Sequence, residues 1–83
     1  MTPDDWFDLL RGRLDAAVDA PSADEIDALL DLARVAAHTS QRWTAPVSGF
    51  LAGLALADLD VDVRADRLRS LADGLEADEA TSS

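Results

Sequence analysis

Hydrophobic residues recur at helical spacing from the start of the chain. Thr2 stands before Pro3, which is the order of a hydroxyl N-cap followed by proline at the first helical position. The pattern predicts a helix from there to about Val18. The apolar side chains that fall on one face of this helix are Trp6, Phe7, Leu10, Leu14, Ala17 and Val18. We expect this face to pack into a core.

A second helix is predicted after Pro21. Ser22 and Glu25 have the spacing of a capping box, and the apolar pattern fades near His38. The predicted buried stripe comprises Ile26, Leu29, Leu30, Ala33 and Ala37, widened by Leu32 and Ala36. Because the connection to the first helix is short, the two are expected to pack antiparallel.

A third helix, Pro46 to Ala57, is apolar on nearly all sides, with Ser48 as its only polar side chain. Such a helix is typically the central, buried one. Gly49 and Gly53 lie four residues apart and would let another helix approach closely. The sequence therefore predicts an all-α fold, a compact bundle of about four helices around the central apolar helix Pro46 to Ala57.

A fourth helix is predicted from Asp62, as its cap, to Leu75. Leu68, Leu71, Ala72 and Leu75 share its apolar side. We expect one helical domain over residues 1–78 and a flexible C-terminal tail over 79–83. A chain of this size has a small core, so it also stands to gain stability as a homodimer.

Charge narrows the range of partners. There are 17 acidic and 7 basic residues, for a formal net charge of -10, and every basic residue is arginine, a usage typical of a GC-rich or salt-adapted host. Nucleic acid and anionic membranes repel such a surface. The longest apolar stretch, Ala45 to Ala57, is shorter than the roughly 20 residues of a membrane span. With no secretory signal pattern at its start, the protein is expected to be cytoplasmic.

Cysteine and histidine, the side chains that most often act as nucleophile, general base or transition-metal ligand, are scarce. The chain has no cysteine and one histidine, His38, which shares a helix flank with Asp27, Asp31 and Arg34. A metal site needs three or four convergent ligands, and an arginine among them opposes a cation. A metal-dependent enzyme using Asp31 and His38 is thus an outside hypothesis, and a charge-paired, solvated helix edge is favoured. We expect no catalytic residue, no metal and no cofactor.

The connection between the second and third helices is the best candidate for a binding site. The free N-H groups that begin a helix, with a nearby arginine and histidine, can hold an anion. The candidate ligand- or partner-binding residues are His38, Arg42, Trp43, Thr44 and Pro46. The structural alternative is that Trp43 covers the core and Arg42 pairs with an aspartate.

The middle of the chain also resembles a known family. The segment 32–38 (LARVAAH) is followed by Arg42, by Ala45–Pro46 and by 50–55 (FLAGLA). This order resembles a small actinobacterial family of unknown function, found alone or fused to molybdopterin-guanylyltransferase-like nucleotidyltransferases. Trp43 departs from the pattern, which has proline after the arginine.

The resemblance implies an accessory role in molybdenum cofactor (molybdopterin guanine dinucleotide) biosynthesis, with a nucleotidyltransferase or a molybdoenzyme-related protein as partner. The first hypothesis is accordingly a non-enzymatic protein-interaction domain, which would use the 38–46 connection and exposed apolar flanks such as Leu9 or Leu32. The second is a module that binds an anion, nucleotide or pterin at the same connection.

Overall fold

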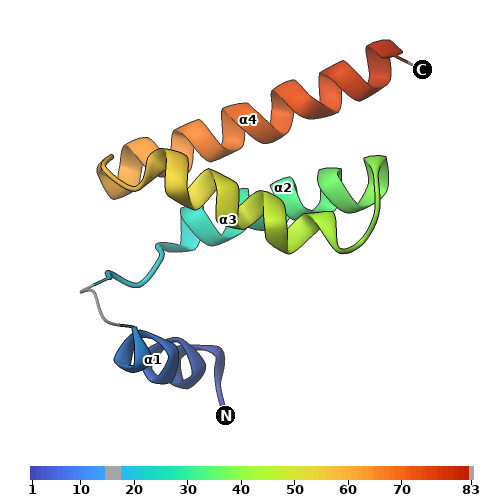
Figure 1. Ribbon diagram of the computed structural model, residues 1–83. Helices are drawn as coiled ribbons and strands as arrows, with labels where there is room; N and C mark the ends of the chain where they lie inside the picture. Colours follow the sequence, from blue (N-terminus) through green and yellow to red (C-terminus); the bar gives the residue numbers. More distant parts are fainter. Residues whose placement is uncertain (15–17, 83) are drawn as a thin grey trace.

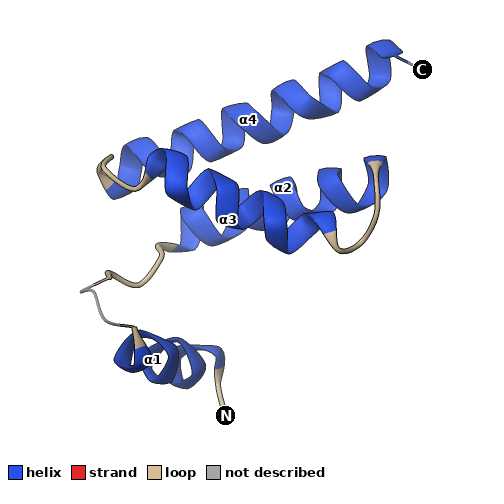
Figure 2. Cartoon of the chain, in the orientation of Figure 1, coloured by secondary structure: helices blue, strands red, loops and turns tan. Residues whose placement is uncertain are grey.

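The computed structural model describes residues 1–14 and 18–82, with the backbone alone for 79–82. Four helices follow one another: α1 (Pro3–Arg13), α2 (Ala23–Thr39), α3 (Thr44–Leu56) and α4 (Val61–Ser82). Within the described ranges there is no strand (Figure 2). The predicted all-α fold is confirmed. None of the described helices is long and apolar enough to cross a bilayer.

The predicted starts of the first two helices are confirmed by complete capping boxes. The Asp5 backbone N-H donates to Thr2 Oγ1 at 3.1 Å, and the Thr2 N-H donates to Asp5 Oδ2 at 3.2 Å. Ser22 and Glu25 exchange the equivalent two bonds, both at 3.1 Å. These bonds satisfy N-H groups that a helix start otherwise leaves without a partner. Helix α3 begins at Thr44, before the predicted Pro46, and α4 begins at Val61, so Asp62 lies within its first turn and is not its cap.

The predicted end of the first helix at Val18 is wrong. Helix α1 ends at Arg13 because Leu14 adopts an extended conformation and its N-H bonds back to the Arg11 carbonyl at 3.2 Å. Val18 lies outside any helix, and its carbonyl accepts a hydrogen bond from Arg11 Nε at 2.6 Å. Ala17 falls outside the described residues.

Helix α4 is longer than predicted. It continues to Ser82, seven residues beyond Leu75. The added residues contain alanine and glutamate but no proline or glycine, so nothing in the chain interrupts the helix. The Glu76 carboxylate also accepts a hydrogen bond from Arg34 of α2 at 3.1 Å, which fixes this turn to its neighbour. The division at residue 78 stays a prediction.

The central helix is α2, and the prediction that Pro46 to Ala57 occupies the centre is wrong. Helix α2 packs against both α3 and α4, which meet each other over a smaller contact (Figure 1). In α3 only Ala52 is buried. Apolar side chains all round a helix indicate burial only if enough other chain exists to surround it, and here two helices contact α3 on one side. The core cluster is Ala28, Leu32, Ala52, Leu68 and Ala72, with Leu29 and Leu56 packed against it.

The buried face of α2 is rotated from the predicted stripe. Its buried residues are Glu25, Ala28, Leu32 and Val35, whereas Leu30 is 63% exposed. Leu32, proposed from the sequence as an exposed flank for a partner, is only 2% exposed, so that prediction is wrong. The buried face differs from the predicted one because α3 and α4 both pack against the side of α2 that carries Leu32. On α4, likewise, Ala65, Leu68 and Ala72 are buried while Leu71 and Leu75 remain partly exposed.

Helix α1 stands apart from the other three (Figure 1). It contacts no other helix, so the predicted antiparallel packing on α2 is wrong. The chain is extended at Leu14, where α1 ends, and again at Ser22, just before α2 begins. The radius of gyration is 13.7 Å, against about 12 Å for a tightly packed chain of this length.

The two glycines of α3 do not receive another helix. A Cβ built on Gly49 or Gly53 meets nothing within 4 Å. We therefore expect Gly53→Ala to raise the free energy of unfolding by about 0.5–1 kcal/mol, because alanine restricts the unfolded chain and favours the helix. Urea unfolding followed by circular dichroism measures this. Gly74→Ala in α4, where a Cβ also meets nothing, is the matched control. A loss of stability confined to Gly53→Ala would contradict the open surface.

Candidate functional site

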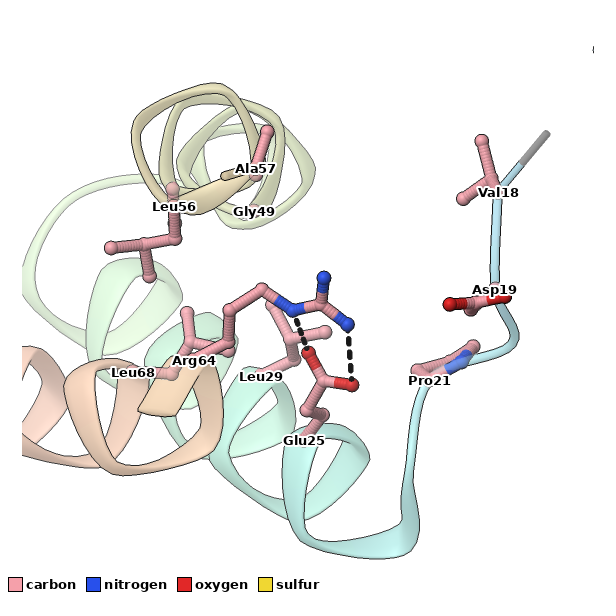
Figure 3. Close-up of a pocket in the computed structure, with 12 residues that line it drawn as sticks. Val18, Asp19, Pro21, Glu25, Leu29, Gly49, Leu56, Ala57, Arg64 and Leu68 are labelled. Atoms are coloured by element: carbon pink, nitrogen blue, oxygen red, sulfur yellow. Dashed lines mark hydrogen bonds and ion pairs between the residues drawn. The ribbon is translucent and has the colours of Figure 1, made fainter. Parts of the chain in front are cut away.

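A groove of about 540 Å³ lies between α2, α3, α4 and the connection that leads into α2 (Figure 3). Leu29, Leu56 and Leu68 supply its apolar surface, one from each helix. Gly49 and Gly53 leave the α3 side open. Asp19 and Pro21, from the described part of the connection, line the opposite side.

The polar end of the groove is an ion pair that ties α2 to α4. Arg64 Nε donates to Glu25 Oε2 at 2.7 Å and Arg64 Nη2 donates to Glu25 Oε1 at 3.2 Å, which is a two-pronged contact (Figure 3). Arg64 Nη1 also donates to the Leu59 carbonyl at 3.4 Å. The Glu25 side chain is 7% exposed and that of Arg64 25%.

This environment fixes the charges of both groups. The hydrogen bonds from Arg64 lower the pKa of Glu25; burial opposes them, and the Ser22 backbone N-H lowers the pKa further. Glu25 in turn raises the pKa of Arg64 through its hydrogen bonds, with smaller contributions from the charges of Asp19 and Asp60. Both groups are therefore ionised and paired at neutral pH. The pair acts as a clasp between helices and offers no free acid, base or cation at neutral pH.

Sequence reasoning missed this pair. Glu25 was recognised only as a capping residue, and Arg64 was not singled out. A signal was present, because Arg64 lies one turn before Leu68 on the side of α4 that also carries Ala65 and Ala72. A charge within an apolar stripe needs a partner of opposite sign.

The larger functional feature is the outside of α3. Five large apolar side chains recur there at helical spacing and are exposed, with Phe50 at 66% and Leu54 at 64%. We call this set the α3 outer face; it comprises Trp43, Val47, Phe50, Leu51 and Leu54. The side of α3 that meets α2 and α4 carries Ala52, which is buried, Ser48, which is half-buried, and Leu56, which packs against the core. Apart from Leu56, the large apolar side chains of α3 point toward solvent.

A second exposed apolar surface lies on α1. Trp6, Leu9, Leu10 and Leu14 are each between 42% and 52% exposed, and Phe7 is half-buried. We call Trp6, Leu10 and Leu14, which share the predicted apolar side of the helix, the α1 face. The sequence correctly predicted that Trp6 and Leu10 share one side of a helix, but Leu14 lies just beyond its end. In the described part of the chain this side does not pack on the core formed by α2, α3 and α4.

The predicted 38–46 site is divided between three elements. His38 lies in the last turn of α2, Arg42 in the turn and Thr44 and Pro46 in the first turn of α3. His38 and Arg42 are both exposed. Trp43 is also exposed, its Nε1 donates to Gln41 Oε1 at 3.1 Å, and it joins the α3 outer face instead of covering the core.

The N-H groups that begin α3 already have acceptors. Those of Thr44 and Ala45 donate to the carbonyls of Gln41 and Arg42 at 3.0 and 3.3 Å, and Pro46 has none. The Thr44 hydroxyl donates to the Gln41 carbonyl at 2.6 Å. These bonds close the turn internally, so backbone donors do not point at a ligand. Anion binding through His38 and Arg42 stays a prediction.

The charged flank of α2 forms the ion-paired edge that the sequence favoured. Asp31 lies 3.6 Å from Arg34 and 3.5 Å from Arg69 of α4, and Arg34 also pairs with Glu76. The aspartate thus contacts two arginines, which opposes its use as a cation ligand. In the ranges 1–14 and 18–82 no group of three His, Asp or Glu side chains is placed to hold a metal ion.

Fold and surface together define a small helical domain that has an ion-paired clasp inside and two unpartnered apolar helix faces outside, an arrangement typical of binding domains. No curated protein and no solved structure matches the chain. A family model does: the chain belongs to the family described as a domain of unknown function (DUF6457), which matches residues 1–81.

Proposed function

We propose that this is a non-enzymatic protein-interaction domain and that the α3 outer face is its binding surface. The observation that supports this proposal is the solvent exposure of five large apolar side chains on one side of α3, whereas only Ala52 of this helix is buried and Leu56 packs against the core. Isolated apolar side chains on a surface need no explanation, but a continuous set on one helix marks an interaction site. Aromatic residues such as Trp43 and Phe50 are enriched at the centres of protein interfaces.

The surface also indicates the kind of partner. Helix α3 carries no charged residue, so its outer face offers shape and apolar area without ion pairs. Val47, Phe50 and Leu54 follow the four-and-three spacing with which one amphipathic helix packs against another. We therefore propose a helical partner segment with an apolar face.

The finer proposal is an accessory role in molybdenum cofactor biosynthesis, with a nucleotidyltransferase or molybdoenzyme-related protein as the partner. It is supported by the resemblance of 32–38 and 50–55 to the nucleotidyltransferase-associated family. The second of these segments lies on α3 and includes Phe50, Leu51 and Leu54 of the outer face. One of the two segments that carry the resemblance thus overlaps the proposed surface, whereas the other, 32–38, lies on α2.

Leu54→Glu tests the surface. We expect it to weaken partner binding at least tenfold, since a carboxylate without a partner in an apolar interface costs more than about 1.4 kcal/mol. Leu30→Glu on α2 is the matched control, because the change is identical and the two side chains are equally exposed, at 64% and 63%. Titration calorimetry against the host's molybdopterin nucleotidyltransferase measures the affinity.

The outcomes separate the coarse and fine proposals. If the nucleotidyltransferase binds neither variant nor wild type, the molybdenum link is wrong; quantitative comparison of proteins co-purified from host cells by the wild type, Leu54→Glu and Leu30→Glu then tests the surface alone. Equal recovery by all three would contradict the α3 outer face as a binding site.

A further inference from the structure

The free chain exposes more surface than a folded monomer of its size should. Its accessible surface is 6302 Å², whereas a folded monomeric protein of 8.8 kDa exposes about 4,800 Å². The excess is about 1,500 Å². Two features contribute to it: α1 contacts no other helix, and α3 is covered on one side only. A surface of this extent is what an obligate partner covers.

The two exposed surfaces match each other. Helix α1 has 11 residues and α3 has 13, so they are about 16 and 20 Å long. Each presents an apolar face with a tryptophan near its N-terminal end, Trp6 on α1 and Trp43 at the start of α3. Since α3 carries no charge, the aspartates of α1 meet no like charge there. Each chain thus has one unpartnered apolar helix and one unpartnered apolar surface of similar length.

We infer that the occupant of the α3 outer face is the α1 helix of a second copy of this chain. This rests on the proposed function: in the chain on its own the second copy covers the same surface, so a helical segment of another protein binds there only by displacing that α1. In a two-fold symmetric pair, α1 of each chain packs on α3 of the other. Both contacts are then made within the dimer, and no surface is left for a third chain. Covering the excess on both chains buries about 3,000 Å², within the range of obligate homodimers.

The connection between the helices favours exchange over packing within one chain. Arg11 of α1 donates through Nε to the Val18 carbonyl at 2.6 Å, and this bond ties α1 to the start of the connection. Val18 and Asp19, in the described part of the connection, then line the groove beside α2 and α4 (Figure 3). Helix α1 is held clear of its own α3, with its apolar face free for another chain (Figure 1).

Light scattering gives the first test. We expect the wild-type chain and Leu30→Glu to have twice the 8.8 kDa chain mass at micromolar concentration. Leu54→Glu places a charge in both copies of the contact, so we expect its dimer dissociation constant to rise about 100-fold and its mass to fall to that of one chain.

Cysteine cross-linking distinguishes exchange from packing within one chain, and the absence of native cysteine makes the readout clean. Leu10→Cys in a tagged chain and Leu54→Cys in an untagged one are refolded together and oxidised. We expect a mixed disulfide between chains of different size. Leu10→Cys with Leu30→Cys is the control pair and should give little.

The other possible results of the cross-linking and light-scattering experiments each contradict the exchange of α1, the proposed binding surface, or both. A disulfide within one chain of the doubly substituted Leu10→Cys, Leu54→Cys protein, with a monomeric mass, would overturn the exchange. A monomeric wild type that loses partner binding on Leu54→Glu would overturn the second copy but leave the protein-interaction domain standing. If Leu54→Glu changes neither mass nor partner recovery, both proposals fail.

Discussion

Leu32→Ala is expected to lower the free energy of unfolding by about 3 kcal/mol, the usual cost of removing a fully enclosed leucine. Leu32 is 2% exposed, and three of its four companions in the buried cluster are alanines. Such short side chains cannot swing into the space that the substitution leaves. The total stability of an 83-residue domain is about 4–12 kcal/mol, so this single change removes a large part of it.

The matched control is Leu30→Ala, two residues away on the same helix. Leu30 is mostly exposed, so the identical chemical change should cost less than about 0.5 kcal/mol. Urea unfolding monitored by circular dichroism measures both variants. Equal losses would mean that α2 is turned as the sequence pattern had predicted, with Leu30 inside.

Glu25→Ala is expected to cost about 2–3 kcal/mol of stability, because it removes charge-assisted hydrogen bonds to Arg64 and half of a capping box. It also leaves the Arg64 guanidinium without its partner in a partly enclosed site. Asp24→Ala is the control, since Asp24 is an exposed acid in the same first turn. A loss no larger than that of the control would show that the clasp contributes nothing beyond the helix dipole.

The same carboxylate sets part of the acid sensitivity of the fold. The pKa of Glu25 is lower in the folded chain than its ordinary value of 4.5, so the folded state binds this proton less readily than the unfolded state. The stabilisation is therefore complete above pH 4.5 and is lost as the pH falls below it, through the lowered pKa. Glu25→Gln should remove this contribution. Stability curves of wild type and Glu25→Gln that stay parallel from pH 7 to pH 3 would contradict the assignment.

Local signals in the sequence were sufficient to predict the starts of α1 and α2. A cap residue and its partner lie three positions apart, so Thr2 with Asp5 and Ser22 with Glu25 specify a helix start without reference to the rest of the chain. The all-α class followed from the same local patterns. The Glu25–Arg64 pair joins residues 39 positions apart, and its formation depends on how α2 and α4 pack.

The packing errors share a cause. An apolar pattern shows that a helix can be buried, but it does not show which neighbour is available to bury it. Helix α3 was assigned to the centre because it is apolar all round, although small residues at Ser48, Gly49 and Ala52 and large ones at Phe50 and Leu54 already distinguished two sides. Helix α1 was assigned to α2 on the length of the connection alone.

The predicted 38–46 site differs from the surface that the structure presents, the α3 outer face, for the same reason. The 38–46 connection was chosen because polar and aromatic residues gather there, yet the turn uses its own backbone donors on its own carbonyls. Of the five predicted residues, Trp43 takes part in the surface that the structure presents, as the first member of the α3 outer face. An exposed apolar face without polar groups has the same pattern as a face that packs into a core, so its exposure could not be predicted from the sequence.

The exposed outer face of α3 also bears on how the protein behaves in a cell. Helix α3 is anchored to the fold mainly by Ala52, which is buried, and Leu56, which packs against the core, whereas most of its large apolar side chains are exposed. Whatever covers that face binds the folded chain and not the unfolded one, so it shifts the folding equilibrium by mass action. On the proposal that another chain covers this face, chains without that cover would unfold and be degraded first.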